Sequence, residues 1–257
     1  MEIKIDQLGG VCLITFNRPK VYNSFNKPMA MALQRTLDEC AKDDNVRAIV
    51  LKGEGKAFCA GQDLAEVTDP DGPELKSIVG DHYNPIVSRI RSIEKPIIAA
   101  VNGVAAGAGA NMALACDIVF AKKSASFIQA FSKIGLIPDS GGTYFLPRII
   151  GMQKAMALMM TGDKVSAEEA EEMTMIYKAV DDEDFDETVM TFAEKLSKMP
   201  TRALGLTKKA VNSSYNNTME QQLDLEENLQ NEASKTNDFD EGVQAFLEKR
   251  TAKFTGK

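Results

Sequence analysis

Alternating apolar and polar positions at the start of the chain predict two strands of a hairpin. Ile3 and Ile5 alternate with polar neighbours, and Gly9-Gly10 supplies a turn before an apolar run over residues 11–16. Apolar runs without such alternation predict strands that are buried on both faces. These runs cover residues 46–51, 97–101 and 118–121.

Helical patterns separate the predicted strands. Asn26 suits the N-cap of a helix over residues 26–41, in which Leu33 and Leu37 share one face. Further helices are expected over residues 74–93 and, built from small residues, over 107–116. Because strands alternate with helices through the first two thirds of the chain, the pattern predicts an α/β fold. A capping box opens at Ser166, and helical periodicity dominates from Phe185 onward, with breaks at 199–200 and 213–217.

Composition narrows the class of protein. The 257 residues allow one large domain or two small ones, and a net charge of −7 argues against a nucleic-acid binder. No apolar stretch approaches the roughly 18–20 residues of a membrane span, and the charged N-terminus is unlike a signal peptide. The four cysteines lack paired spacing and are expected to be free, buried thiols. Such thiols are typical of a reducing cytosol, so we expect a cytoplasmic protein.

The chain contains one histidine, His82, and this count limits the available chemistry. A zinc site needs several His or Cys ligands close together, so no metal site is expected. A Ser-His-Asp or Cys-His mechanism would have to run through His82, which we interpret as a surface or pocket-wall residue rather than a base. Chemistry by carboxylates or by backbone dipoles is therefore the leading expectation.

Two segments rich in small residues follow predicted strands. Residues 58–64 read FCAGQDL, and residues 101–111 read VNGVAAGAGAN. Small residues let backbone N–H groups approach a ligand, and the second segment opens a helix whose N-terminus suits an anion or a developing oxyanion. The alternative for the first is a plain tight turn, and for the second close packing of a helix on a sheet.

A third segment, residues 135–143, places Asp139 in an apolar loop just before a predicted helix. Burial there would raise the pKa of the Asp139 carboxyl, which would make it a base suited to abstracting a proton from carbon. The alternative is an N-cap on the helix that follows.

Taken in this order, the three segments resemble the crotonase family of acyl-CoA enzymes. The resemblance spans nearly the whole chain, from Asn17-Arg18-Pro19 to the final residues 254–257. It implies a spiral of ββα units over residues 1–199 and a helical C-terminal trimerisation region over 200–257. It also implies a homotrimer or a dimer of trimers, an acyl-CoA substrate, and no permanently bound cofactor, since CoA arrives as part of the thioester.

The resemblance also implies roles for individual residues. The backbone N–H groups of Ala60 and Ala108 would form an oxyanion hole for the thioester carbonyl. Family hydratases activate water with two glutamates, and Asn111 and Phe131 stand at those two places here. Neither side chain can act as a base, so the resemblance argues against two-carboxylate hydration. Asp139 is left as the general acid/base.

Within the family, the motifs look most like bacterial phenylacetate-pathway isomerases, which convert a ring-1,2-epoxide of phenylacetyl-CoA to the oxepin form. Tyr83, Asn111 and Phe131 would then line the acyl pocket. Residues on the CoA side would be Gln62, Asp63 and Leu64. The CoA phosphates would meet basic residues near Arg18 and Lys20, together with Phe254 and Lys257 of a neighbouring subunit. Two alternatives stay open: a Δ3,Δ2-enoyl-CoA isomerase or hydratase of fatty-acid oxidation, and a non-catalytic acyl-CoA-binding subunit.

Overall fold

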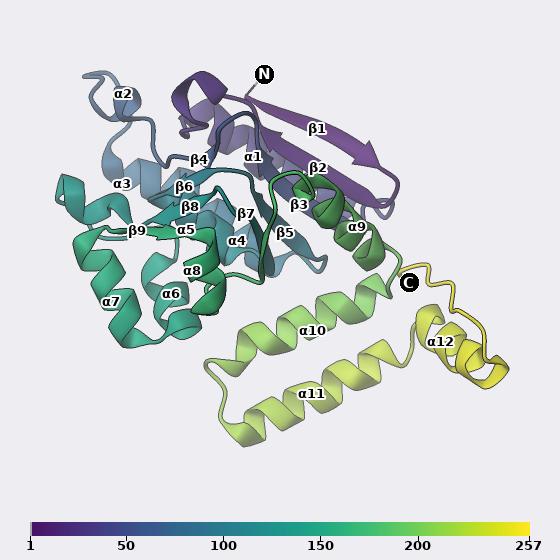
Figure 1. The fold of residues 1–257 in the computed structure, drawn as a ribbon. Coiled ribbons are helices and arrows are strands. Elements are labelled where there is room, and N and C mark those ends of the chain that lie inside the picture. The colour runs from purple at the N-terminus through teal and green to yellow at the C-terminus, as the bar shows by residue number, and fades with distance from the viewer. Residues whose placement is uncertain (1) are drawn as a thin grey trace.

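Two β-sheets form the body of the protein in a computed structural model that describes residues 2–257 (Figure 1). The larger sheet has the order β1-β2-β3-β5-β7-β10 and the smaller one β4-β6-β8-β9. The N-terminal strands β1 (Ile3–Leu8) and β2 (Val11–Phe16) pair antiparallel, as the hairpin pattern predicts. From β2 to β10 (Lys178–Val180), neighbours in the larger sheet are parallel.

The chain repeats one unit three times: a strand in the large sheet, a short strand in the small sheet, then helix. The first unit is β3 (Ala48–Gly53), β4 (Ala57–Cys59), and helices α2 (Leu64–Val67), α3 (Leu75–Ser77) and α4 (Asn84–Ser92). The second unit is β5 (Ile97–Val101), β6 (Val104–Ala106) and α5 (Ala108–Ala115). The third unit is β7 (Ile118–Lys122), β8 (Ser126–Ile128), η3 (Ala130–Ile134) and α6 (Gly142–Ile150). This arrangement confirms the predicted α/β spiral of ββα units.

Local sequence accounts for the elements around this spiral. The Asn26 side chain accepts a hydrogen bond from the Met29 N–H at 3.1 Å, so it caps α1 (Lys27–Lys42) as predicted. The capping box at Ser166 is present and starts α8 (Ala167–Glu172). The remaining elements of the body are η1 (Pro19–Val21), α7 (Met152–Thr161), β9 (Lys164–Ser166) and α9 (Phe185–Ser197).

One predicted helix differs from the structure. The segment 74–93 is not a uniform α-helix, because a π-helical stretch, η2 (Ile78–Tyr83), separates α3 from α4. A π-helix widens the turn and is common near functional sites. It turns both His82 and Tyr83 into the interior, where they are 3% and 1% exposed.

The C-terminal helices α10 (Thr201–Ser214), α11 (Met219–Ala233) and α12 (Asn237–Glu248) lie beside the body rather than in it (Figure 1). The nearly buried ammonium of Lys208 fastens α10 to the body, donating to the Asp117 carboxylate at 2.8 Å and to the Ile90 carbonyl at 2.6 Å. Large apolar side chains of α11 and α12 stay exposed, among them Met219, Leu223, Phe246 and Leu247. Among residues 2–257, no helix has the length and apolar character needed to span a membrane.

Candidate active site

The two small-residue segments meet where β4 ends and α5 begins. A Cβ placed on Gly109 would lie 2.3 Å from the Cys59 carbonyl oxygen, so only glycine permits this approach. A Cβ on Gly61, whose φ is +93°, would lie 3.6 Å from the Ala108 nitrogen. Glycine at positions 61 and 109 therefore allows the backbone after β4 to contact the first turn of α5.

The two predicted oxyanion donors differ in their present partners. Ala108 is the first residue of α5, so its N–H has no carbonyl one turn earlier within the helix. The Ala60 N–H donates to the Tyr22 carbonyl at 3.0 Å. A thioester oxygen that used both donors would have to replace the Tyr22 carbonyl at Ala60.

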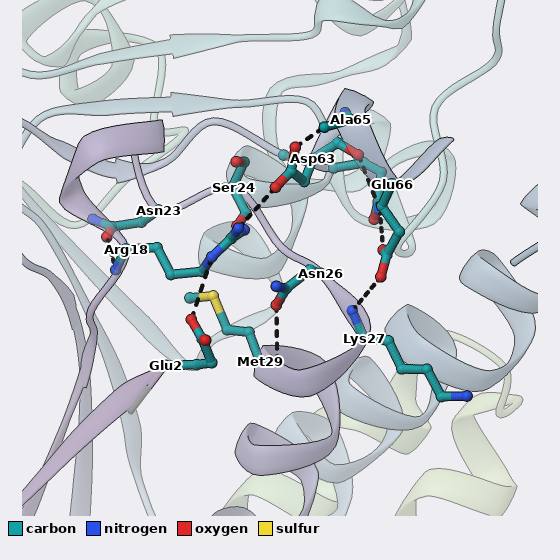
Figure 2. A network of polar contacts seen from close by, with 12 residues as sticks. Glu2, Arg18, Asn23, Ser24, Asn26, Lys27, Met29, Asp63, Ala65 and Glu66 are labelled. Atoms are coloured by element: carbon teal, nitrogen blue, oxygen red, sulfur yellow. Dashed lines mark hydrogen bonds and ion pairs between the residues drawn. The ribbon is translucent and has the colours of Figure 1, made fainter. Parts of the chain in front are cut away.

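An ion pair anchors the segment that carries Ala60 (Figure 2). The Arg18 guanidinium lies 2.8 Å from the Asp63 carboxylate and 3.3 Å from the Glu2 carboxylate, and it also donates to the Ser24 carbonyl. The other Asp63 oxygen accepts the Ala65 N–H at 3.1 Å and so caps α2. Asp63 thus holds the turn and the start of α2 in one place.

A chain of side-chain hydrogen bonds joins the interior to α2. The Tyr83 hydroxyl donates to Gln62 at 2.9 Å, and the Gln62 amide nitrogen donates to the Glu66 carboxylate at 2.7 Å. Glu66 in turn accepts the Lys27 N–H at 2.8 Å (Figure 2). Burial raises the pKa of the Tyr83 phenol well above its ordinary value, and the Cys59 thiol and Asp139 carboxylate raise it further. Leu64, in contrast, is 56% exposed.

The Asp139 carboxyl group is not the N-cap of α6. That position belongs to Gly141, and no side chain caps the helix. One Asp139 carboxylate oxygen accepts the Ser140 hydroxyl at 2.8 Å. Burial raises the pKa of Asp139 above its ordinary value, while the bond from Ser140 opposes this shift. The capping alternative is therefore wrong, and the raised pKa makes the Asp139 carboxylate a stronger base than an exposed one.

Asn111 and Phe131 are both buried beside these groups. The Asn111 amide nitrogen donates to the Asp139 carbonyl at 2.8 Å, and its oxygen accepts from the Gln129 amide at 2.8 Å. The Phe131 ring lies 3.8 Å from the point that a Cβ on Gly107 would occupy. Contacts therefore link residues 61, 108, 111 and 139, which come from three separate turns of the spiral.

A surface position for His82 is wrong. The side chain is buried, and Nδ1 has no hydrogen-bond partner in the part of the chain that the structure describes. Burial lowers the pKa of the imidazole, while the Glu66 carboxylate opposes the shift, so the ring is neutral near pH 7. The extended π-helical turn buries this residue, which the sequence pattern alone did not indicate.

Two residues of one subunit, Arg18 and Lys20, and two of a neighbouring subunit, Phe254 and Lys257, were expected near the CoA phosphates, and the single chain shows their contacts within it. Arg18 is already paired with two carboxylates, and Lys257 forms an ion pair with Asp44 at 2.9 Å. Lys20 is exposed, and the Phe254 carbonyl accepts from Arg47 at 2.9 Å.

All four cysteines are free and buried, as predicted. Within residues 2–257, no cluster of three or more His, Cys, Asp or Glu side chains could hold a metal ion.

Sequence reasoning missed two polar residues of this site. Ser140 donates to Asp139, and Gln129 donates to Asn111. Ser140 stood in the quoted segment without a role, and its left-handed φ of 52° is not visible in a sequence. Gln129 follows a short apolar strand, and this polar residue in an apolar stretch was the available signal.

The fold and this arrangement agree with comparisons to known proteins. Residues 6–257 match the family model described as enoyl-CoA hydratase/isomerase. The chain therefore belongs to the enoyl-CoA hydratase/isomerase family, the crotonase family of the sequence resemblance.

Individual relatives cover almost the whole chain. A 1,2-epoxyphenylacetyl-CoA isomerase of Escherichia coli (strain K12) is 50% identical over 96% of this chain and 96% of its own. A probable enoyl-CoA hydratase of Rhodobacter capsulatus is 46% identical over 96% of this chain and 95% of its own. The crystal structure of an enoyl-CoA hydratase from Bacillus anthracis superposes with a TM-score of 0.96 at 33% identity, covering 100% of both chains.

Proposed function

We propose that this enzyme is an acyl-CoA isomerase whose substrate is 1,2-epoxyphenylacetyl-CoA, and that Asp139 is its general acid/base. The observation that carries the proposal is the state of the Asp139 carboxyl group. It is partly buried, its pKa is raised by that burial, and within residues 2–257 it takes part in no ion pair, whereas Asp63 and Glu66 are committed to protein donors. The similarity to the E. coli isomerase supports the choice of substrate.

The Ala108 N–H would hold the thioester oxygen, and the Ala60 N–H would join it once it releases the Tyr22 carbonyl. Removing a proton next to a thioester carbonyl gives an enolate, whose negative charge collects on that oxygen. A preset N–H donor at such an oxygen stabilises the transition state by roughly 3 to 4 kcal/mol. The dipole of α5 favours the same charge, because Ala108 is its first residue.

One carboxylate is enough for an isomerisation. In moving a double bond from C3 to C2, Asp139 would take the proton from C2 and return it to C4, so no atom is gained or lost. Opening the ring epoxide to an oxepin is also an isomerisation. Hydration needs a second group to activate water, and the buried Asn111 and Phe131 offer no base for that purpose.

Assembly and location are part of the same proposal. We propose a cytoplasmic homotrimer or dimer of trimers held together by the C-terminal helices. Exposed apolar side chains on α11 and α12 support this assembly, with Phe246 83% and Leu247 69% exposed. The substrate is the acyl-CoA itself, and no permanently bound cofactor is required.

The test compares turnover on 1,2-epoxyphenylacetyl-CoA, a straight-chain 3-enoyl-CoA and crotonyl-CoA. The proposal predicts isomerisation of the first two, with preference for the ring substrate, and hydration of crotonyl-CoA at most weakly. Efficient hydration of crotonyl-CoA would overturn it.

A second candidate is a Δ3,Δ2-enoyl-CoA isomerase or enoyl-CoA hydratase of fatty-acid oxidation. The Rhodobacter relative, described as a probable hydratase, favours it. Turnover of the 3-enoyl-CoA far above the ring substrate would support this second candidate. A non-catalytic acyl-CoA-binding subunit would bind all three thioesters and turn over none.

A further inference from the structure

Two buried carboxamide side chains lie next to Asp139: Asn111 is bonded to its main chain, and Gln129 is bonded to Asn111. Neither has a catalytic role in the proposed function. Asn111 and Gln129 are 0% and 2% exposed. The Asp139 carbonyl can only accept hydrogen bonds, so the amide nitrogen of Asn111 must face it. This fixes the Asn111 oxygen toward Gln129, which must then present its own amide nitrogen. The orientation of both side chains is therefore set by the main chain of Asp139.

This fixed orientation leaves one acceptor without a donor. Gln129 Oε1 is buried and has no hydrogen-bond partner in the described part of the chain. A buried acceptor without a protein donor does not stabilise the fold, so the contribution of Gln129 lies in the hydrogen bond that it donates to Asn111. Through this bond Gln129 fixes the side chain of Asn111, which in turn holds the main chain of Asp139.

The backbone at Asp139 is constrained from several sides. Its carbonyl also accepts the Gly142 N–H at 2.8 Å, and a Cβ on Gly142 would lie 2.2 Å from the Asn111 amide nitrogen. Ser140, the next residue, has a left-handed φ of 52°, which is unfavourable for a side chain with a Cβ. Asn111 therefore contacts both Asp139 and the start of α6. These contacts help to hold the turn in which Ser140 has its unfavourable left-handed backbone conformation.

We propose that Asn111 and Gln129 are positioning residues, which hold the Asp139 carboxylate in register with the N-terminus of α5. This inference rests on the proposed function, because it concerns the geometry of the same acid/base. Asn111 lies one turn after Ala108 on α5, so the pair ties the acid/base to the helix that would hold the thioester oxygen. A displacement of about 1 Å at such a site can reduce turnover roughly a hundredfold.

The test uses Asn111→Leu, Gln129→Met and the double variant, measured by kcat, KM, melting temperature and the pH dependence of kcat/KM. Asn212→Leu is a matched control, because Asn212 also donates to a main-chain carbonyl, that of Arg91, but on α10 away from the site. Asn111→Leu and Gln129→Met should each lower kcat about tenfold or more with KM changed less than about twofold. Gln129→Met removes one unpaired acceptor but leaves the Asn111 amide oxygen without its donor, so the melting temperature should change little. The double variant should be no slower than the slower single one, as expected of residues that act as a unit.

The pH profile separates positioning from a structural role. Once Asp139 is released toward water, its pKa should fall, so the acid limb of kcat/KM should move to lower pH. Asn212→Leu should lower the melting temperature and leave kcat and the acid limb unchanged. Unchanged kcat and acid limb in Gln129→Met and Asn111→Leu, beside an inactive Asp139→Asn, would overturn this inference alone. Full activity of Asp139→Asn would overturn the proposed function and the inference with it.

Discussion

Gly109 is the position at which one added methyl group should damage the site most directly. A Cβ there would lie 2.3 Å from the Cys59 carbonyl oxygen and 2.7 Å from its Sγ. The atom nearest to the added methyl group is a main-chain oxygen, which cannot move by rotating a side chain. Helix α5 and the turn after β4 must therefore separate by several tenths of an ångström or more. Forced overpacking of this kind lowers the free energy of unfolding by about 1–3 kcal/mol.

The same separation would disturb the two N–H groups proposed to hold the thioester oxygen. Loss of one such donor reduces kcat by about 10²–10³-fold. Gly109→Ala should therefore lower both stability and turnover, measured by urea unfolding and by assay of the folded fraction. Gly80→Ala is the matched control: its Cβ would meet nothing within 4 Å, and in a helical segment alanine should be neutral or stabilising by up to about 1 kcal/mol. A Gly109→Ala protein that unfolds and turns over like the wild type would refute the close-approach argument.

Three further outcomes are expected. Arg18→Gln should raise KM for acyl-CoA and lower the free energy of unfolding by about 1 kcal/mol, because it releases Asp63 from a partly exposed ion pair. Steady-state kinetics and urea titration measure the two effects, and an unchanged KM would count against the prediction. Asp139→Asn should be at least as stable as the wild type at neutral pH. The folded-state pKa of Asp139 is raised, so the carboxyl group stabilises the fold at low pH, and this contribution is lost as pH rises above the unfolded pKa near 3.8. The melting temperature of the wild type relative to Asp139→Asn should therefore fall between pH 4 and 7, and a rise over that range would contradict the prediction. Leu223→Glu with Phe246→Glu should shift the sedimentation coefficient toward that of a monomer, and an unchanged coefficient would remove these helices from the interface.

Patterning with a clear period was sufficient to predict the larger elements. The hairpin, the capped helix at Asn26, the buried strands and the small-residue helix α5 all follow from apolar spacing and local capping. The strands of the smaller sheet were not predicted, because β4, β6 and β8 have three residues each and too few positions to define a period.

The candidate site shows the same division. The family resemblance indicated that the turns at Ala60 and Ala108 meet, and an acidic residue in an apolar loop indicated Asp139. The hydrogen bond between Asn111 and Gln129 joins residues 18 positions apart across two turns of the spiral, so no local pattern reveals it. The burial of His82 depends on a π-helical turn, whose wider spacing departs from the helical period used to predict the segment.

The central claim is that Asp139 carries the proton between carbon atoms. The measurement that tests it most directly is the transfer of deuterium from C2 of a 3-enoyl-CoA deuterated at C2 to C4 of its product, followed by mass spectrometry for the wild type and Asp139→Asn. The account predicts deuterium at C4 of the wild-type product, at least about a hundredfold slower transfer in the variant, and thioester binding retained by both. Transfer at the wild-type rate in Asp139→Asn would contradict the account, since another group would then move the proton.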